Sequence, residues 1–327
     1  MKIGLAGVGH LGKIHLKCLL NIPEWTVSGI YDADAENAKK VGEEYGVHVF
    51  SSFNELLEAS DAVDLVTPTT THFELARQVL KSRKHLFIEK PVTHTLQEAR
   101  KLQKLYAEAE VKVQVGHVER FNPAFLAVKD QIKNPMFIEA HRLAEFNPRG
   151  TDVPVVLDLM IHDIDVVLAA VQSPVKKISA SGVAVISDTP DITNARIEFL
   201  NGTVANLTAS RISMKKMRKM RIFQRDAYIS VDFLTKESEV ISLVPENERG
   251  KNPFALTLTN AAGETKELEY SKPEIKPLNA IEEELKSFYY SIVNKTTEEV
   301  PLDDGVSSLE VAHEILQKIR VNLSMIQ

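Results

Sequence analysis

A glycine-rich hexapeptide near the start of the chain constrains the fold more than any other feature. Residues 7–12 have the sequence Gly-Val-Gly-His-Leu-Gly, directly after a short apolar run and directly before an amphipathic segment. Asp32 follows Gly12 by twenty residues, at the end of the second apolar run. A strand, a G-x-G-x-x-G turn, a helix and a later acidic residue form the fingerprint of a dinucleotide-binding Rossmann domain.

The glycines of this turn have separate tasks. Gly7 permits the tight turn, Gly9 lets the backbone approach a pyrophosphate, and Gly12 lets the helix pack on the strand. The unpaired N–H groups at the start of the helix, around His10 and Leu11, favour an anion.

Asp32 indicates which dinucleotide binds. Its carboxylate can accept hydrogen bonds from the adenosine ribose hydroxyls and would repel a 2′-phosphate, and no arginine directly follows it. NAD is therefore favoured, and NADP is not excluded.

Alternating apolar runs and amphipathic segments continue through the first third of the chain. This rhythm predicts a doubly wound parallel α/β sheet. The expected strands are residues 3–6, 27–31, 47–50, 62–66, 85–88 and 111–115, and the expected helices are 11–20, 35–45, 73–80 and 96–109.

The rhythm changes near residue 120, where we place a domain boundary. We expect an NAD(P)-binding Rossmann domain over residues 1–120. Residues 121–327 are expected to form a substrate-binding and oligomerisation α+β domain with a large, mostly antiparallel sheet, and its C-terminal helices can pack back toward the first domain. Its expected strands are 137–143, 179–187, 195–199, 203–210, 220–224, 228–233, 239–243 and 254–259, with helices at 155–171, 278–293 and 305–323.

Composition and charge exclude several classes of protein. The chain has 327 residues, 44% hydrophobic and 26% charged, with a net charge of −6, which argues against nucleic acid as a partner. It has no membrane-length apolar run, and its one cysteine excludes an intrachain disulfide. We expect a cytoplasmic protein that acts on a small molecule.

Two short motifs follow strands of the predicted parallel sheet. Thr67-Pro68 and Glu89-Lys90-Pro91 fall at its carboxyl edge, where ligands of open α/β sheets bind. Lys90 has an equally simple alternative interpretation as a solvated loop residue, but its place on the cofactor side favours a functional role.

The apolar helix expected at 155–171 carries a polar stripe. Asp158, His162 and Asp165 stand at i, i+4 and i+7, and burying them is costly unless they are paired or face a wet cleft. A structural ion-pair network is one interpretation. The functional interpretation is hydride transfer, with His162 exchanging the proton, Asp158 orienting it and Lys90 holding the substrate oxygen. This chemistry needs no metal, and none is expected.

A basic segment, Lys215-Lys216-Met217-Arg218-Lys219-Met220-Arg221, follows a strand of the second domain. A solvated loop with an edge strand is one interpretation, and contact with a phosphate-bearing substrate is the other.

These motifs together resemble the Gfo/Idh/MocA oxidoreductase family over the whole chain. The resemblance implies that Lys90, Asp158 and His162 are catalytic. The resemblance also implies that the cofactor is contacted by Thr67, Pro68, His72 and Glu89. It implies that the substrate is contacted by His117, Arg120, Arg149 and Asp165. The resembling motifs are Gly7 to Gly12, Thr67-Pro68 with His72, Glu89-Lys90-Pro91, residues 116–123 and the helix from Asp158 to Asp165.

Within the family, residues 115–123 and 214–219 are most similar to the branch of UDP-N-acetylglucosamine 3-dehydrogenases. Where the family usually has glycines before the catalytic helix, this chain has Asp152-Val153-Pro154-Val155, which speaks against inositol. We expect an enzyme that oxidises a ring hydroxyl of a sugar or nucleotide sugar, as a homodimer or homotetramer. The alternatives are a non-catalytic dinucleotide sensor, and an enzyme acting on inositol or a non-sugar carbonyl.

Overall fold

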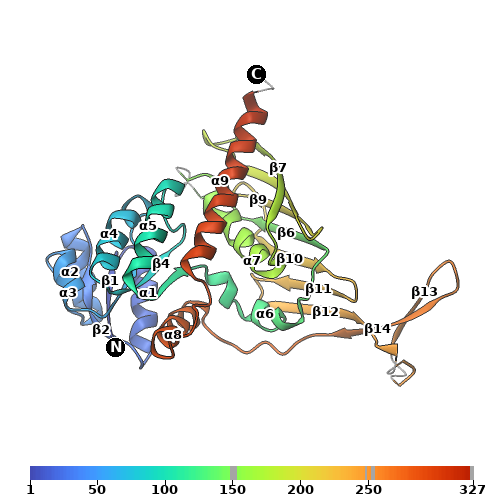
Figure 1. Ribbon diagram of the computed structural model, residues 1–327, viewed down its shortest axis with the longest axis horizontal. Coiled ribbons are helices and arrows are strands. Elements are labelled where there is room, and N and C mark those ends of the chain that lie inside the picture. Colours follow the sequence, from blue (N-terminus) through green and yellow to red (C-terminus); the bar gives the residue numbers. More distant parts are fainter. Residues whose placement is uncertain (148–152, 247–248, 252–254, 325–327) are drawn as a thin grey trace. The chain divides into compact units, whose positions relative to one another are not determined.

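The structure, a computed structural model, describes residues 1–147, 153–246, 249–251 and 255–324 and divides into two units (Figure 1). The first unit comprises Met1–Phe121 and Leu278–Val311, and the second comprises Asn122–Pro277 and Ala312–Gln327. Helix α9 (Leu302–Ser324) contributes its first part to one unit and its last part to the other. Among the described residues, no helix is long and apolar enough to cross a bilayer.

The first unit is built on a parallel sheet of five strands in the order β2-β1-β3-β4-β5. The predicted doubly wound Rossmann sheet is confirmed. Its central strands are buried on both faces, which is why their sequences are continuous apolar runs. The strands are β1 (Lys2–Ala6), β2 (Thr26–Tyr31), β3 (Ala62–Leu65), β4 (His85–Glu89) and β5 (Val113–Gly116).

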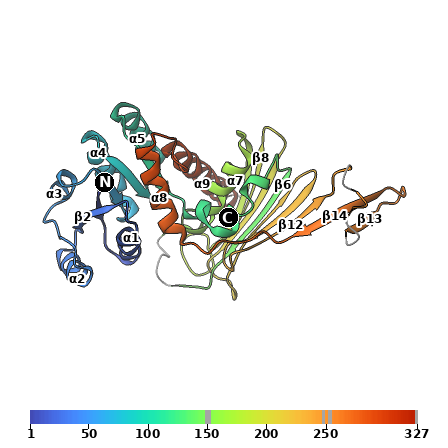
Figure 2. The same cartoon turned by 90° about the horizontal axis from the view of Figure 1, so that it is seen from below.

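Helices cover both faces of this sheet, with α4 and α5 on one side and α1 and α2 on the other (Figure 2). Side chains of Asp34, Ser52 and Thr95 cap α2, α3 and α5, the last with a complete capping box that includes Glu98. The helices are α1 (His10–Asn21), α2 (Ala35–Tyr45), α3 (Phe53–Glu58), α4 (Thr69–Lys81), α5 (Leu96–Ala109), the 3-10 turn η1 (Val118–Phe121) and α8 (Ala280–Val293).

Residues 47–50 do not form the expected strand. Only Val49 makes an isolated bridge, to Ile30. Ile30 of β2 donates to the carbonyl oxygen of His48 at 2.8 Å and accepts from the N–H of Phe50 at 2.9 Å, so the segment lies beside β2 and pairs with it around this one residue.

The second unit is built on a sheet of nine strands in the order β13-β14-β12-β11-β10-β6-β9-β8-β7. All neighbouring pairs are antiparallel except β6 with β9, so the predicted mostly antiparallel sheet is confirmed. Asn201-Gly202 forms the predicted hairpin turn, with Gly202 at φ +91°. The strands are β6 (Phe137–Leu143), β7 (Val175–Val183), β8 (Ile192–Phe199), β9 (Val204–Ser210), β10 (Met217–Phe223), β11 (Ala227–Asp232), β12 (Glu237–Leu243), β13 (Leu256–Thr259) and β14 (Thr265–Ser271).

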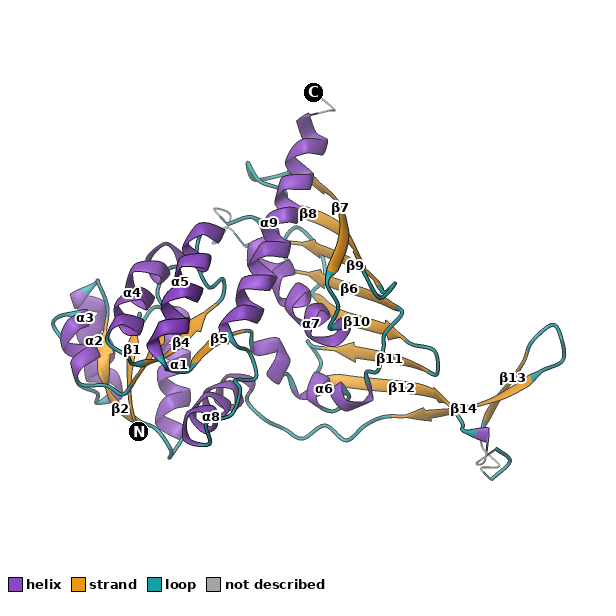
Figure 3. Cartoon of the chain, in the orientation of Figure 1, coloured by secondary structure: helices purple, strands orange, loops and turns teal. Residues whose placement is uncertain are grey.

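Helices α6 and α7 pack on one face of this sheet (Figure 3). Every second residue of β6 is buried on that face, including Ile138, Ala140 and Arg142. The helical elements of this unit are α6 (Pro123–Leu126), the 3-10 turn η2 (Lys129–Gln131), the π-turn η3 (Val156–Met160) and α7 (Ile161–Val171).

Candidate active site

The glycine loop between β1 and α1 has the geometry that its sequence predicts. Gly7 has φ +91°, and a Cβ there would lie 2.6 Å from the carbonyl oxygen of Val66. A Cβ on Gly12 would collide with the carbonyl oxygen of Gly7. No atom of the described chain lies within 4 Å of a Cβ built on Gly9, so the loop is open on that side. This is the side on which a pyrophosphate can approach the backbone.

The start of α1 suits an anion. Gly9 precedes the helix and gives it no side-chain cap, and no acidic residue stands in the first turn. Both features leave the positive end of the helix dipole uncompensated within the described chain. The side chains of His10 and Leu11 are exposed, so these residues would meet a bound dinucleotide through their backbone N–H groups or their outer surfaces.

Asp32 connects the end of β2 to the glycine loop. One carboxylate oxygen accepts a hydrogen bond from the N–H of Val8 at 2.7 Å, and the other accepts from the N–H of Asp34 at 2.9 Å. The side chain is half-buried. Each oxygen has a second lone pair, so Asp32 can support the loop and still accept from a ribose hydroxyl.

His72 joins the two loops at the carboxyl edge of the sheet. Its ring nitrogens lie 3.0 Å from the carbonyl oxygen of Pro91 and 2.9 Å from that of Thr67. Burial lowers the pKa of His72, although the two carbonyl groups oppose this. The structure therefore gives His72 a bracing position between Thr67-Pro68 and Lys90-Pro91, whose peptide bond is cis.

Lys90 is half-buried and follows β4, whose last residue, Glu89, is buried. Glu89 accepts a hydrogen bond from the N–H of Lys90 at 3.1 Å, and its other oxygen lies 3.3 Å from Nε2 of His15. Nδ1 of His15 lies 2.9 Å from Asp64. Sequence reasoning assigned Glu89 to the cofactor and missed His15 and Asp64, although the spacing of His15 three residues after Gly12 was a usable signal.

His15 lies between two carboxylates, a setting that favours its protonated form. Burial alone would lower the pKa of His15, but Asp64 and Glu89 more than offset this and raise it well above its ordinary value. Glu284 from α8 lies nearby, and His15, Glu89 and Glu284 have donor atoms within 4.8 Å of one another, a spacing that a metal ion could use. Because both ring nitrogens of His15 already face carboxylates, we interpret the group as an ion-pair cluster.

The motif at residues 116–123 also lies partly in the first unit. Arg120 is buried, and its guanidinium lies 2.9 Å from the carboxylate of Asp304 and donates to the carbonyl oxygen of Glu299 at 3.2 Å. His117 is buried as well. These contacts hold the Arg120 side chain inside the first unit. Substrate binding by Arg120 and His117 stays a prediction.

In the second unit, the polar stripe begins on a π-turn. Asp158 lies in η3 and His162 in the first turn of α7, and both are half-buried. The expected regular helix over 155–171 is therefore wrong in its first turn, because i→i+5 bonding widens it. Such turns occur often at functional sites. The structure confirms that Asp158 and His162 follow one another along a continuous helical segment.

Asp165 lies deeper than the other two and is fully buried. The neighbouring Asp163, which sequence reasoning did not single out, makes a two-pronged ion pair with Arg142 of β6 at 2.8 and 3.0 Å. This buried pair fixes α7 on the sheet. Arg149 lies outside the described residues.

The basic segment is not an edge strand. Most of it forms β10, which lies between β6 and β11. Lys219 pairs with Asp232 at 3.1 Å and Arg221 with Glu139 at 3.1 Å, so the sheet neutralises both charges. Lys215 is exposed just before the strand.

Comparisons with known proteins agree with this geometry. The Gfo/Idh/MocA family model described as "Oxidoreductase family, NAD-binding Rossmann fold" matches residues 1–117. The model of the family's C-terminal domain matches residues 136–230. A UDP-N-acetylglucosamine 3-dehydrogenase from Acidithiobacillus ferrooxidans is 40% identical over 235 residues, which cover 72% of this chain and 74% of that protein. The scyllo-inositol 2-dehydrogenase (NAD(+)) of Bacillus subtilis is 28% identical over 232 residues, covering 65% and 68%.

Solved structures give the same result. UDP-N-acetylglucosamine 3-dehydrogenase GnnA from Acidithiobacillus ferrooxidans matches with a TM-score of 0.88 and 32% identity, over 98% of both chains. Because the family matches span both domains, they identify more than a shared Rossmann fold. This chain belongs to the Gfo/Idh/MocA family and is an oxidoreductase with a nicotinamide cofactor.

Proposed function

We propose that this enzyme uses NAD⁺ to oxidise a ring hydroxyl of a UDP-sugar, with UDP-N-acetylglucosamine as the first candidate and C3 as the carbon oxidised. The observation that carries the proposal is the similarity to the Acidithiobacillus ferrooxidans enzyme, at 40% identity over 235 residues. No other relative considered above reaches this identity, and the inositol dehydrogenase has 28%.

The residues of the first unit fit a dinucleotide. The open side of Gly9 and the uncapped start of α1 would hold the pyrophosphate, and Asp32 would accept from the adenosine ribose. The bound nicotinamide supplies the hydride acceptor. Asp32 favours NAD over NADP because its negative charge would repel a 2′-phosphate.

The catalytic groups proposed are Lys90, Asp158 and His162. His162 accepts the hydroxyl proton as the C–H bond breaks, Asp158 orients His162, and the ammonium of Lys90 holds the developing carbonyl oxygen. The balance is one hydride to the cofactor and one proton to His162, which leaves a ketone on the sugar ring. The exposed Lys215 is a candidate contact for the diphosphate of the nucleotide sugar.

A substrate panel tests this proposal. Reduced nicotinamide would be followed by absorbance with NAD⁺ or NADP⁺ and, in turn, UDP-N-acetylglucosamine, UDP-glucose, myo-inositol and scyllo-inositol. We expect turnover with NAD⁺ and UDP-N-acetylglucosamine and its loss in Lys90→Ala. Turnover with the inositols alone would show that the substrate is a polyol and not a UDP-sugar. Tight NAD⁺ binding with no turnover on the whole panel would favour a sensor.

A further inference from the structure

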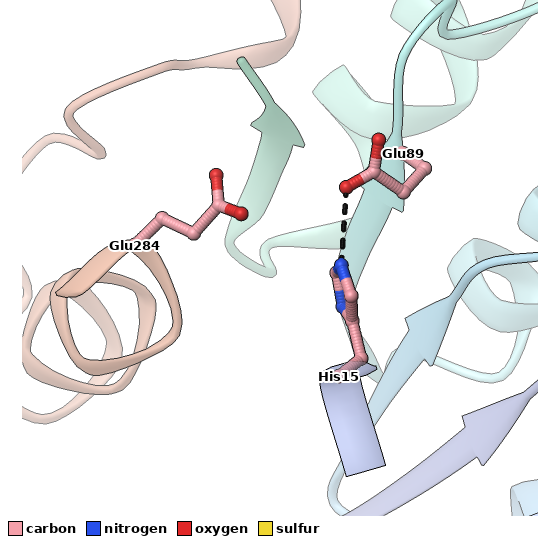
Figure 4. A group of neighbouring side chains, drawn as sticks. All are labelled: His15, Glu89 and Glu284. Carbon is pink, nitrogen blue, oxygen red and sulfur yellow. Dashed lines mark ion pairs between the residues drawn. The ribbon is translucent and has the colours of Figure 1, made fainter. Parts of the chain in front are cut away.

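Four ionisable side chains meet in the interior of the first unit, each from a different element. His15 of α1 stands between Asp64 of β3 and Glu89 of β4. Glu284 of α8 points toward His15 and Glu89 (Figure 4). Asp64, His15 and Glu284 have no exposed surface, and Glu89 has 7%. None of the four was needed to explain the glycine loop or the polar stripe.

The charges of this cluster cannot all be present together. One imidazolium beside three ionised carboxylates would leave two uncompensated negative charges in the core, which is very costly. His15 contacts Asp64 and Glu89 directly, whereas neither oxygen of Glu284 has a hydrogen-bond partner among the described residues. Burial also raises the pKa of Asp64, but the direct contact with His15 opposes this rise. Glu284, which has no such contact, is therefore the carboxyl group that is costliest to ionise. Burial first, and then the nearby Glu89, raise the pKa of Glu284 well above its ordinary value.

The position of the Glu89 carboxylate is fixed from several sides. One oxygen faces His15 at 3.3 Å, and the other accepts from the N–H of Lys90 at 3.1 Å. On the neighbouring strand, a Cβ on Gly116 would come within 2.5 Å of this carboxylate, so only glycine leaves it room. The cluster thus reaches the backbone of Lys90 through the hydrogen bond that the Lys90 N–H donates to Glu89.

Glu284 is also held firmly in place. The side-chain amide of Gln114 donates to the backbone oxygen of Glu284 at 2.7 Å, and the indole N–H of Trp25 donates to that of Leu285 at 3.0 Å. These two bonds anchor α8 to the sheet and to the chain after α1. The backbone position from which the Glu284 side chain reaches toward Glu89 is therefore held by hydrogen bonds.

We propose that His15 is a positioning residue for Lys90, acting through Glu89, and that an uncharged Glu284 lets Glu89 keep the negative charge on which this depends. The inference rests on the proposed catalytic role of Lys90. His15 and Glu284 act through Glu89 and are not expected to touch substrate or cofactor themselves.

The arrangement predicts a pH dependence. The ionisable groups that face Glu284 are His15 and Cys18 from α1, Asp64 from β3 and Glu89 from β4, and Glu89 in turn interacts with Lys90. When rising pH removes the proton of Glu284, a second carboxylate appears beside Glu89. The repulsion loosens the hold on Lys90, so the rate should fall at alkaline pH.

The test compares His15→Gln, Glu284→Gln and wild type in NAD⁺-dependent turnover of UDP-N-acetylglucosamine from pH 6 to 10. We expect His15→Gln to lower kcat by roughly tenfold or more, because small misplacements of a catalytic group cost about this much or more. Its KM for NAD⁺ should stay within about twofold, since the glycine loop is untouched. Glu284→Gln should match wild type at pH 7 and keep its rate at alkaline pH, where wild type declines.

His85→Gln is the matched control, because His85 stands at the other end of the strand that ends with Glu89, where its Nδ1 accepts from the N–H of Lys112 at 2.9 Å. It should leave kcat and the pH profile unchanged. A wild-type kcat in His15→Gln, or parallel pH profiles for Glu284→Gln and wild type, would overturn the proposal. A merely structural role would change the melting temperature and leave the pH profile where it was.

Hydrogen exchange at the Lys90 amide separates this inference from the proposed function. If wild type turns over no UDP-sugar, the function fails, but the amide still reports on positioning. At pH 9 we expect faster exchange at Lys90 in wild type than in Glu284→Gln. Equal exchange would refute the positioning role, and the same measurement decides the matter if His15→Gln does not fold.

Discussion

At the scale of single residues, Gly9 and Gly12 separate cofactor binding from stability. Gly9 has φ −67°, a value any residue adopts, and an open side, whereas a Cβ on Gly12 collides with Gly7. We expect Gly9→Ala to melt within about 2 °C of wild type but to bind NAD⁺ roughly tenfold more weakly, because its methyl group occupies the approach of the pyrophosphate. Gly12→Ala should lower the melting temperature. Calorimetric titration with NAD⁺ measures the affinity. Wild-type affinity in Gly9→Ala would refute the role of Gly9 in pyrophosphate binding.

Asp32 gives a second prediction at this scale. Asp32→Asn removes the charge that would repel a 2′-phosphate, while its side-chain oxygen can still accept from Val8. The ratio of kcat/KM for NAD⁺ over NADP⁺ should fall roughly tenfold or more, about 1.4 kcal/mol. Asp34→Asn is the control, because Asp34 caps α2 through the N–H of Asn37. An unchanged ratio in Asp32→Asn would show that another residue selects the cofactor.

Sequence reasoning reached the residues that stand in local motifs and missed those that meet only in space. Gly7, Gly9 and Gly12 could be assigned separate roles because a turn is determined by neighbouring residues. His15 and Glu284 are separated by 269 positions, and only the packing of α8 beside α1 brings them together. Arg142 and Asp163 pair for the same reason, since β6 and α7 are joined by tertiary packing.

At the scale of elements, the loop between β7 and β8 depends on one carboxylate. Asp191 accepts from the N–H groups of Val185, Ile186 and Ser187 at 2.7 to 3.1 Å and from the Ser187 hydroxyl at 2.6 Å. Burial alone would raise the pKa of Asp191, but these hydrogen bonds lower it below its ordinary value. A lowered folded-state pKa contributes stability above the unfolded value, near about 3.9, and loses it as pH falls through the folded value.

Asp191→Asn should therefore destabilise the protein at pH 7 by about 1–3 kcal/mol, because its amide N–H₂ group cannot accept from the loop. The difference from wild type should be constant above about pH 5 and narrow below about pH 4. Urea unfolding at several pH values measures it, with the exposed Asp188→Asn as control. If the stability difference between Asp191→Asn and wild type grew toward acid pH, the ionised Asp191 carboxylate would not be the group that stabilises this loop.

Elements were predictable where their pattern was local and regular. β6 and α5 occupy the predicted residues because period-two and period-3.6 patterns determine them. β14 was missed, since its sequence Thr-Lys-Glu-Leu-Glu-Tyr-Ser is largely exposed and shows no clear alternation. An edge strand was one of two interpretations of the basic segment because its charges indicated solvent, but β10 lies inside the sheet, where Asp232 and Glu139 on the flanking strands pair with Lys219 and Arg221.

At the scale of the whole molecule, the two units carry separable parts of the proposed reaction. His162 belongs to the second unit and the glycine loop to the first. We expect His162→Asn to lower kcat by roughly a hundredfold or more, as expected for loss of a general base, while the KM for NAD⁺ stays within about twofold. Steady-state kinetics measures both constants. A wild-type kcat would mean that another group accepts the proton.

Hydride transfer from C3 of the sugar can be followed directly with a labelled substrate. UDP-N-acetylglucosamine deuterated at C3 would be incubated with the enzyme and NAD⁺, and the reduced nicotinamide analysed by mass spectrometry. We expect one deuterium per reduced cofactor with wild type and no product with Lys90→Ala. Reduced cofactor without deuterium, or equal labelling in Lys90→Ala, would contradict hydride transfer from this carbon with Lys90 as a catalytic group.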